Sequence, residues 1–205
     1  MTKDMQKIEK LLIFFECAEK LKTTMRYKSN KEILHESSAA HSWKLSIMVL
    51  ATYRELGPEL DLEKAMKLAI VHDLAEAITD DIDYFLIADG KVSKEQKRNL
   101  EDEAMKEIRR MLSGETGSEI YNLWNDYDNG NSAEAKFVKA LDRIEALTHL
   151  LSIGNEAYER PELIVNYADS AVADFPALMP MLKTIKDRFK LEFEKGGIAW
   201  KQEYE

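Results

Sequence analysis

The stretch 61–81, DLEKAMKLAIVHDLAEAITDD, constrains the fold of this chain more than any other. Its first half has the i, i+3, i+4, i+7 spacing of one apolar helical face, at Leu62, Ala65, Met66 and Ala69. Continued at the same period, this face reaches three ionisable side chains, His72, Asp73 and Glu76. The pattern therefore predicts a helix over 61–78 that carries ionisable groups where it should enter a core.

Ionisable groups on a buried face need compensation, because an unpaired buried charge is strongly unfavourable. Helix 61–78 has no Lys or Arg on this face. A bound divalent metal is our expectation for this face, and a buried salt-bridge network is the alternative.

Composition and periodicity predict an all-α fold. The 205 residues are 45% apolar and 33% charged, with only 8 Gly and 4 Pro, and no strand alternation persists. This length suits a single domain, 1–205, with a metal-binding core over about 6–155 and C-terminal helices over about 160–195. We expect helices over 5–22, 39–56, 61–78, 93–112, 117–127, 132–153, 161–172 and 176–194.

The apolar residues of the first two helices predict which surfaces are buried. Helix 5–22 has one apolar side, formed by Ile8, Leu11, Leu12, Phe15 and Ala18. Helix 39–56 is apolar nearly all round, so we expect it to be buried centrally. Ser37 or Ser38 can cap its start, and Gly57-Pro58 is a typical stop.

Helix 132–153 is the longest apolar pattern in the second half of the chain. Its main stripe comprises Phe137, Ala140, Leu141, Ile144, Leu147 and Leu151. Asn131 with Glu134 predicts an N-terminal cap, and Gly154 predicts the C-terminal end.

The charge balance and cysteine content exclude several classes of function. A formal charge of −9, from 29 basic and 38 acidic residues, argues against broad binding of nucleic acids or anionic membranes. It does not exclude a phosphorylated small molecule, because a bound cation can reverse the local field. The single Cys17 fits a reducing compartment, and the apolar run LLIFF is too short to span a membrane. We expect a cytoplasmic protein.

Two further residues are ambiguous when taken alone. His41 shares a helical face with apolar side chains, where histidine is commonly a hydrogen-bonded core residue. Asp142 lies on a second face of helix 132–153, together with His149, and a salt bridge between helices would give the same pattern. The doublet His72-Asp73 is the stronger signal, since imidazole and carboxylate ligands suit a borderline divalent metal.

Together these residues form the pattern H…HD…D, and the chain resembles the HD-domain metal-dependent phosphohydrolases. The strings that carry the resemblance are ESSAAHSW, VHDLAEAITDDI and KALDRIEAL, within roughly residues 6–150. They are most similar to the branch that contains the bacterial 5′-deoxynucleotidases and the eukaryotic HD-domain-containing protein 2. The resemblance implies a helical bundle with a metal site between its central helices.

The resemblance also implies a cofactor and an activity. His41, His72, Asp73 and Asp142 would hold one divalent ion, cobalt, manganese or magnesium. The activity would be removal of the 5′-phosphate of a (deoxy)nucleoside monophosphate by attack of a metal-bound water, in a homodimeric enzyme. The alternatives are hydrolysis of another phosphorylated small molecule and a non-catalytic module that binds a nucleotide.

Further roles follow from the same resemblance. Arg26 matches the arginine that orients the substrate phosphate, and Glu76 matches the proton-transfer glutamate. Asp81 matches an aspartate that contacts the sugar, while Asp73 and Asp142 would contact the substrate besides the metal.

The chain departs from the family pattern at three positions. Ala40 replaces an acidic residue, Asp80 stands where glycine is common, and Tyr27 stands where the bacterial deoxynucleotidase has tryptophan. The last difference predicts weaker discrimination against ribonucleotides, with Tyr27 as a substrate-binding residue.

Overall fold

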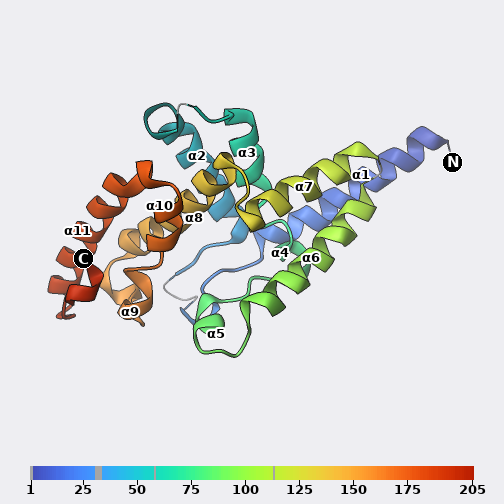
Figure 1. Cartoon of the computed structure of the whole chain (residues 1–205). Coiled ribbons are helices and arrows are strands. Elements are labelled where there is room, and N and C mark those ends of the chain that lie inside the picture. The colour runs from blue at the N-terminus through green and yellow to red at the C-terminus, as the bar shows by residue number, and fades with distance from the viewer. Residues whose placement is uncertain (1, 31–33, 58, 113) are drawn as a thin grey trace.

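The molecule is built from helices (Figure 1). The computed structural model describes residues 2–30, 34–57, 59–112 and 114–205. Within these ranges the sole β-type pairing is an isolated antiparallel bridge between Met25 and Ser37. The all-α prediction is therefore confirmed.

The α-helices are bounded as follows: α1 Lys3–Glu19, α2 Ser38–Leu56, α3 Leu62–Val71, α4 Glu76–Thr79, α5 Tyr84–Ala88, α6 Lys94–Met111, α7 Glu115–Asn129, α8 Ala133–Ile153, α9 Pro161–Ile164, α10 Asp169–Asp174 and α11 Met179–Lys195. Short 3₁₀ turns lie at Lys20–Lys22, Lys28–Asn30, Asn155–Ala157, Pro176–Leu178 and Gln202–Tyr204. None of the described helices is long and apolar enough to cross a membrane.

Helix α8 is the centre of the bundle. It packs against α2, α3 and α7 on one side and against α10 and α11 on the other. Its predicted stripe is buried, except that Leu151 is only half-buried. The cap is Ser132, whose side chain accepts the amide of Ala135, so the prediction of Asn131 as the cap is wrong by one residue.

Two predictions about burial are wrong, both on helices of the outer layer. Helix α2 is buried along one face only, and Trp43, 68% exposed, points to solvent. It packs against α3, α8 and the turn Lys20–Lys22, which cover one face, so an apolar composition all round did not place it at the centre. Ser37 caps this helix as predicted and Gly57 ends it, whereas Pro58 lies outside the described residues.

Helix α1 presents its apolar stripe to solvent, not to the core. Ile8, Leu12 and Phe15 are exposed by 57%, 49% and 57%, and Cys17 is its one buried residue. The reason is positional: α1 contacts α4, α6 and the turn that follows it, while its N-terminal end projects beyond the other helices (Figure 1).

Helix 61–78 is interrupted where its chemistry begins. Asp61 accepts the amide of Lys64 and starts α3 as an N-cap, but α3 ends at Val71. His72 follows as the C-cap, and residues 72–75 form turns before α4. The regions 161–172 and 176–194 are likewise broken into α9, α10, a 3₁₀ turn and α11, with Pro176 at the start of that turn.

Candidate metal centre and active-site cavity

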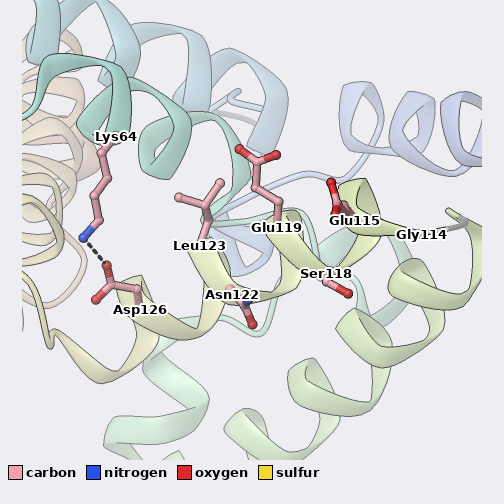
Figure 2. A pocket seen from close by; sticks show the side chains of 8 residues that line it. All are labelled: Lys64, Gly114, Glu115, Ser118, Glu119, Asn122, Leu123 and Asp126. Carbon is pink, nitrogen blue, oxygen red and sulfur yellow. Dashed lines mark ion pairs between the residues drawn. The ribbon is translucent and has the colours of Figure 1, made fainter.

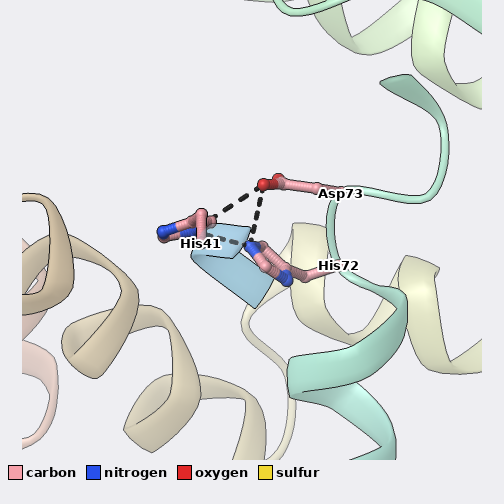
Figure 3. A group of neighbouring side chains, drawn as sticks. All are labelled: His41, His72 and Asp73. Atoms are coloured by element: carbon pink, nitrogen blue, oxygen red, sulfur yellow. Dashed lines mark hydrogen bonds and ion pairs between the residues drawn. The ribbon is translucent and has the colours of Figure 1, made fainter. Parts of the chain in front are cut away.

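Three helical segments bring the residues of the H…HD…D pattern together. His41 comes from the first turn of α2, His72 and Asp73 follow α3, and Asp142 comes from the middle of α8. The Nε2 atom of His41 lies 3.2 Å from His72 Nε2, 3.7 Å from Asp73 Oδ2 and 3.0 Å from Asp142 Oδ1. His72 Nε2 lies 3.1 Å from Asp73 Oδ2 (Figure 3). His41, His72 and Asp73 thus present ligand atoms that lie within 4.8 Å of one another, and Asp142 adjoins them through His41.

The far sides of both imidazoles are held by acceptors. His41 Nδ1 donates to Glu145 Oε2 at 2.5 Å, and His72 Nδ1 donates to the carbonyl of Ala69 at 2.9 Å. A hydrogen on Nδ1 leaves the Nε2 lone pair available, which is the arrangement found around metal-bound histidines. Backbone and side-chain contacts therefore fix both rings with Nε2 facing the cluster.

Asp142 is oriented in the same manner. The hydroxyl of Tyr127, in α7, donates to its Oδ2 at 2.7 Å, which leaves Oδ1 directed at His41. Burial alone would raise the pKa of Asp142, but the charge of Arg143 and the hydrogen bond from His41 hold it well below its usual range. Asp142 is therefore an ionised, buried carboxylate.

His41 carries a proton in the metal-free protein. Burial disfavours its charged form and Arg26 repels it, yet hydrogen bonds with Asp142 and Glu145 raise its pKa to about 10. This proton supplies the positive charge that the surrounding carboxylates require. A divalent cation would supply that charge better, and two imidazole nitrogens with two carboxylate oxygens are a donor set that such cations accept. The residues fit a metal ion.

A cavity of about 560 Å³ opens beside this cluster. All the predicted site residues except His41 line it: Arg26, Tyr27, His72, Asp73, Glu76, Asp81 and Asp142. His41 has no exposed surface and lies behind them. The structure thus collects residues from positions 26 to 142 around a single hollow.

Arg26 is placed at the cavity by a pair of acidic side chains. Its backbone amide donates to the carbonyl of Glu36, next to the isolated bridge, and its Nη1 lies 3.0 Å from Glu36 Oε2. The same nitrogen lies 3.4 Å from Glu145 Oε2. The guanidinium is thus held in place by charge-assisted contacts, with 13% of its side chain exposed.

Glu76 lies in an environment that favours its neutral form. Burial, followed by the negative charges of Asp73 and Asp81, raises its pKa well above the usual value. The hydroxyl of Ser38 donates to Glu76 Oε2 at 2.6 Å and fixes the carboxyl orientation. A buried carboxyl with a raised pKa beside a cavity is suited to proton transfer.

Asp81 lies where the chain turns sharply after α4. Asp80 adopts φ +63°, a left-handed conformation that glycine adopts without strain. Lys28 pairs with Asp80 at 2.6 Å and donates to the carbonyl of Asp81 at 2.8 Å, which holds the turn. Asp80 stands where glycine is common in the family, and its backbone conformation is one that glycine adopts with less strain.

Tyr27 and His149 form a stacked pair beside the cavity. Their ring centroids are 5.6 Å apart at an interplanar angle of 20°. The hydroxyl of Tyr27 and Nε2 of His149 are both buried with no hydrogen-bond partner among the described residues. His149 Nδ1 faces Glu36 at 3.5 Å, so this histidine belongs to the neighbourhood of Arg26 and not to the H…HD…D cluster.

Sequence reasoning missed four residues of this site: Glu36, Lys97, Tyr127 and Glu145. Glu145 follows Asp142 by three positions on the same helical face, a spacing that could have drawn attention to it. Tyr127 and Glu36 carry no comparable sequence signal. Lys97, in α6, lines the cavity, and the charges of Glu101, Glu76 and Asp73 raise its pKa against the effect of burial.

A second hollow lies between α3 and α7 (Figure 2). It is shallower although larger, about 720 Å³, and an ion pair of 2.9 Å between Lys64 and Asp126 crosses one end. Its wall includes none of the histidines, so its chemistry is that of a solvated surface groove.

The chain is similar in sequence to known proteins. The HD-domain family profile matches residues 18–171. The chain is 36% identical over 140 residues to 5′-deoxynucleotidase HDDC2 of Bos taurus, an alignment that covers 68% of this chain and 64% of that protein. It is 33% identical over 196 residues to 5′-deoxynucleotidase HDDC2 of Danio rerio, which covers 93% of both chains.

Solved structures show the same fold. A predicted metal-dependent phosphohydrolase from Magnetospirillum magnetotacticum superposes with a TM-score of 0.75 at 20% identity, covering 95% of this chain and 100% of that one. A protein from Pyrococcus horikoshii superposes with a TM-score of 0.66 at 25% identity, covering 88% and 99%. The chain belongs to the HD-domain family, as its H…HD…D pattern predicted.

Proposed function

We propose that the chain is a metal-dependent phosphohydrolase that removes the 5′-phosphate of (deoxy)nucleoside monophosphates. The observation that carries this proposal is the oriented cluster of two imidazoles and two carboxylates at the wall of a cavity that Arg26 also lines. The printed names of the relatives, 5′-deoxynucleotidases, support the substrate class.

His41, His72, Asp73 and Asp142 would hold one divalent ion, with cobalt, manganese and magnesium as candidates. When bound, such an ion offsets negative charge on phosphate oxygens and lowers the pKa of water. The protein's own contribution is to fix the two rings and Asp142 beforehand, through Glu145, Ala69 and Tyr127.

Arg26 would bind the phosphate. Its guanidinium already faces carboxylate oxygens, and a phosphate presents the same kind of bidentate acceptor. Two carboxylates at the guanidinium keep it in the cavity wall before substrate arrives, which lowers the entropic cost of binding.

Glu76 would handle the proton that the leaving sugar oxygen requires. Its carboxyl is fixed by Ser38, and burial beside Asp73 and Asp81 raises its pKa well above the usual value. Asp73 and Asp142 would contact the phosphate end of the substrate, and Asp81 and Tyr27 the sugar.

The remainder of the cavity suits the nucleoside. A volume of about 560 Å³ lies within the usual range for small-molecule sites, roughly 300–1,000 Å³. Away from the cluster, apolar and aromatic residues line part of the wall: Tyr84, Phe85, Leu147, Leu150, Ile164 and Tyr167. Basic residues (Lys94, Lys97, Arg98, Lys136, Lys139 and Arg143) line it together with acidic ones (Asp83, Glu101, Asp128, Glu159 and Asp174), so Arg26 and a bound cation, not the net charge of the wall, would attract an anionic ligand.

The test is release of inorganic phosphate from matched ribo- and deoxyribonucleoside 5′-monophosphates, assayed with Co²⁺, Mn²⁺ and Mg²⁺. Nucleoside 3′-monophosphates and sugar phosphates serve as control substrates. We expect preferential release from 5′-monophosphates and its loss in Asp73→Ala, together with loss of bound metal. Preferential hydrolysis of sugar phosphates would replace the nucleotide assignment. Tight nucleotide binding without release would point to a non-catalytic module.

We also propose that the protein acts in the cytoplasm as a homodimer. Cys17 is a free, buried thiol, which suits a reducing compartment. The exposed stripe Ile8, Leu12 and Phe15 has the spacing of a helical face that a second helix should cover. Sedimentation equilibrium on the wild type and on Leu12→Glu tests the dimer, and a monomeric wild type at micromolar concentration would refute it.

A further inference from the structure

We propose that Glu145 is a positioning residue that links the metal ligand His41 to the phosphate-binding Arg26. This inference rests on the function proposed above. It assigns one buried carboxylate the task of orienting both the metal ligand and the group that binds substrate.

The contacts of Glu145 define this role. It lies in α8 with no exposed surface, and its Oε2 atom accepts from His41 Nδ1 at 2.5 Å. The same oxygen lies 3.4 Å from Arg26 Nη1, while Oε1 forms an ion pair of 2.9 Å with Lys44. One oxygen is therefore shared between the imidazole and the guanidinium.

A carboxylate in this position is costly to the fold, because burying a charge removes its hydration. Well-packed apolar residues of similar volume commonly stabilise a protein as well as a buried ion pair does. Folding alone therefore gives little reason for a charge here. The two groups that the charge contacts, one from each half of the site, supply a functional reason.

The consequences for the two partners are distinct. For His41, the hydrogen bond from Nδ1 keeps Nε2 facing Asp142 and Asp73, and raises the basicity of the ring as a ligand. For Arg26, the shared oxygen restrains the guanidinium at the cavity wall. A change at Glu145 should therefore weaken metal binding and phosphate binding together.

Glu36 provides a matched control in the same cluster. It is buried, and its Oε2 lies closer to Arg26 Nη1, at 3.0 Å, than that of Glu145 does. Its other oxygen faces His149, and no hydrogen bond or ion pair joins Glu36 to His41 among the described residues, although a carboxylate oxygen of Glu36 lies within 4.8 Å of a His41 ring nitrogen. Glu36 should therefore affect phosphate binding directly and the metal ligand much less than Glu145 does.

The experiment compares Glu145→Gln and Glu36→Gln, since glutamine keeps the size and one acceptor but removes the charge. Titration of metal-free protein with Mn²⁺ by calorimetry gives the metal dissociation constant, and inhibition by inorganic phosphate reports the Arg26 site. We expect Glu145→Gln to weaken Mn²⁺ binding about 10- to 100-fold and phosphate binding as well. Glu36→Gln should weaken phosphate binding and change the Mn²⁺ dissociation constant much less than Glu145→Gln does.

Glu145→Asp keeps the charge and withdraws it by one methylene, so it should restore part of the Mn²⁺ affinity that Glu145→Gln loses. It also carries the test if the glutamine variant does not fold. The proposal would be overturned if folded Glu145→Gln bound Mn²⁺ as tightly as wild type does. If only Glu145→Asp folds, wild-type Mn²⁺ affinity in that variant would overturn it. So would an equal loss of metal affinity in Glu36→Gln. A wild type that binds Mn²⁺ but hydrolyses no nucleotide would overturn the proposed activity alone, since the metal arm for Glu145 does not depend on turnover.

Discussion

Removing the hydroxyl of Tyr127 is the most direct perturbation of the preformed site. Tyr127→Phe deletes one oxygen and keeps the ring, so the edge contact with His72 and the cation–π contact with Lys139 are preserved. What is lost is the 2.7 Å hydrogen bond to Asp142 Oδ2. Asp142 Oδ2 then faces Arg143 Nε at 3.8 Å, while His41 Nε2 still lies 3.0 Å from Oδ1, so the carboxyl group is held less firmly.

A hydrogen bond to a charged group contributes about 1.5–3 kcal/mol. For 205 residues each kcal/mol shifts Tm by about 2–4 °C, so we expect a fall of roughly 3–12 °C. Loss of a group that orients a metal ligand typically weakens metal binding about 10- to 100-fold. Both effects should appear in one protein that remains folded.

The assay is urea unfolding of the metal-free protein, with Mn²⁺ titration calorimetry on the same samples. The matched control is Tyr158→Phe, because the hydroxyl of Tyr158 is also buried but has no hydrogen-bond partner among the described residues. Its ring packs on Phe189 and Phe193, and phenylalanine keeps those contacts. The control should change stability by less than about 0.5 kcal/mol or increase it. Equal effects of the two substitutions would refute the assignment of the Tyr127 hydroxyl to Asp142.

Three further predictions concern the proposed activity. Arg26→Ala should lower kcat/KM by about 10²-fold or more while one ion per chain remains bound, and an unchanged kcat/KM would remove Arg26 from the site. The pKa of His41 is raised to about 10, so in the metal-free protein this proton must leave before Nε2 can bind an ion. Mn²⁺ affinity should therefore rise about tenfold per pH unit from 7 towards 10, and titrations that show no dependence over this range would contradict the protonated state. Tyr27→Trp should increase the preference for dAMP over AMP, in kcat/KM, by up to the 1–3 kcal/mol typical of rejecting one small group. If wild type already rejects AMP as strongly as Tyr27→Trp does, Tyr27 does not determine the preference for deoxyribose.

The periodic patterns along the chain predicted which segments are helical, and the reasons are local. Helix α8 follows its apolar stripe, and caps at Ser37 and Asp61 satisfy free backbone amides within one turn. The break of helix 61–78 after Val71 has no such signal, since no glycine or proline lies there. That break depends on the packing of His72 and Asp73 into the site.

The chain by itself determined that His72, Asp73 and Glu76 need a partner, because ionisable groups at helical spacing on an apolar face require one whatever the fold. His41 and Asp142 joined them as candidate ligands only through the resemblance to the HD-domain family. The chain also determined the family, through His41, His72-Asp73 and Asp142 in order. Which apolar faces are covered was decided only by tertiary structure, as the exposed stripe of α1 shows. Periodicity fixes a face relative to its own helix axis and contains no information on what that face meets. For the same reason Glu145 is visible as a neighbour of Asp142, whereas its contacts with His41, 104 positions away, and Arg26, 119 positions away, exist only once the helices pack.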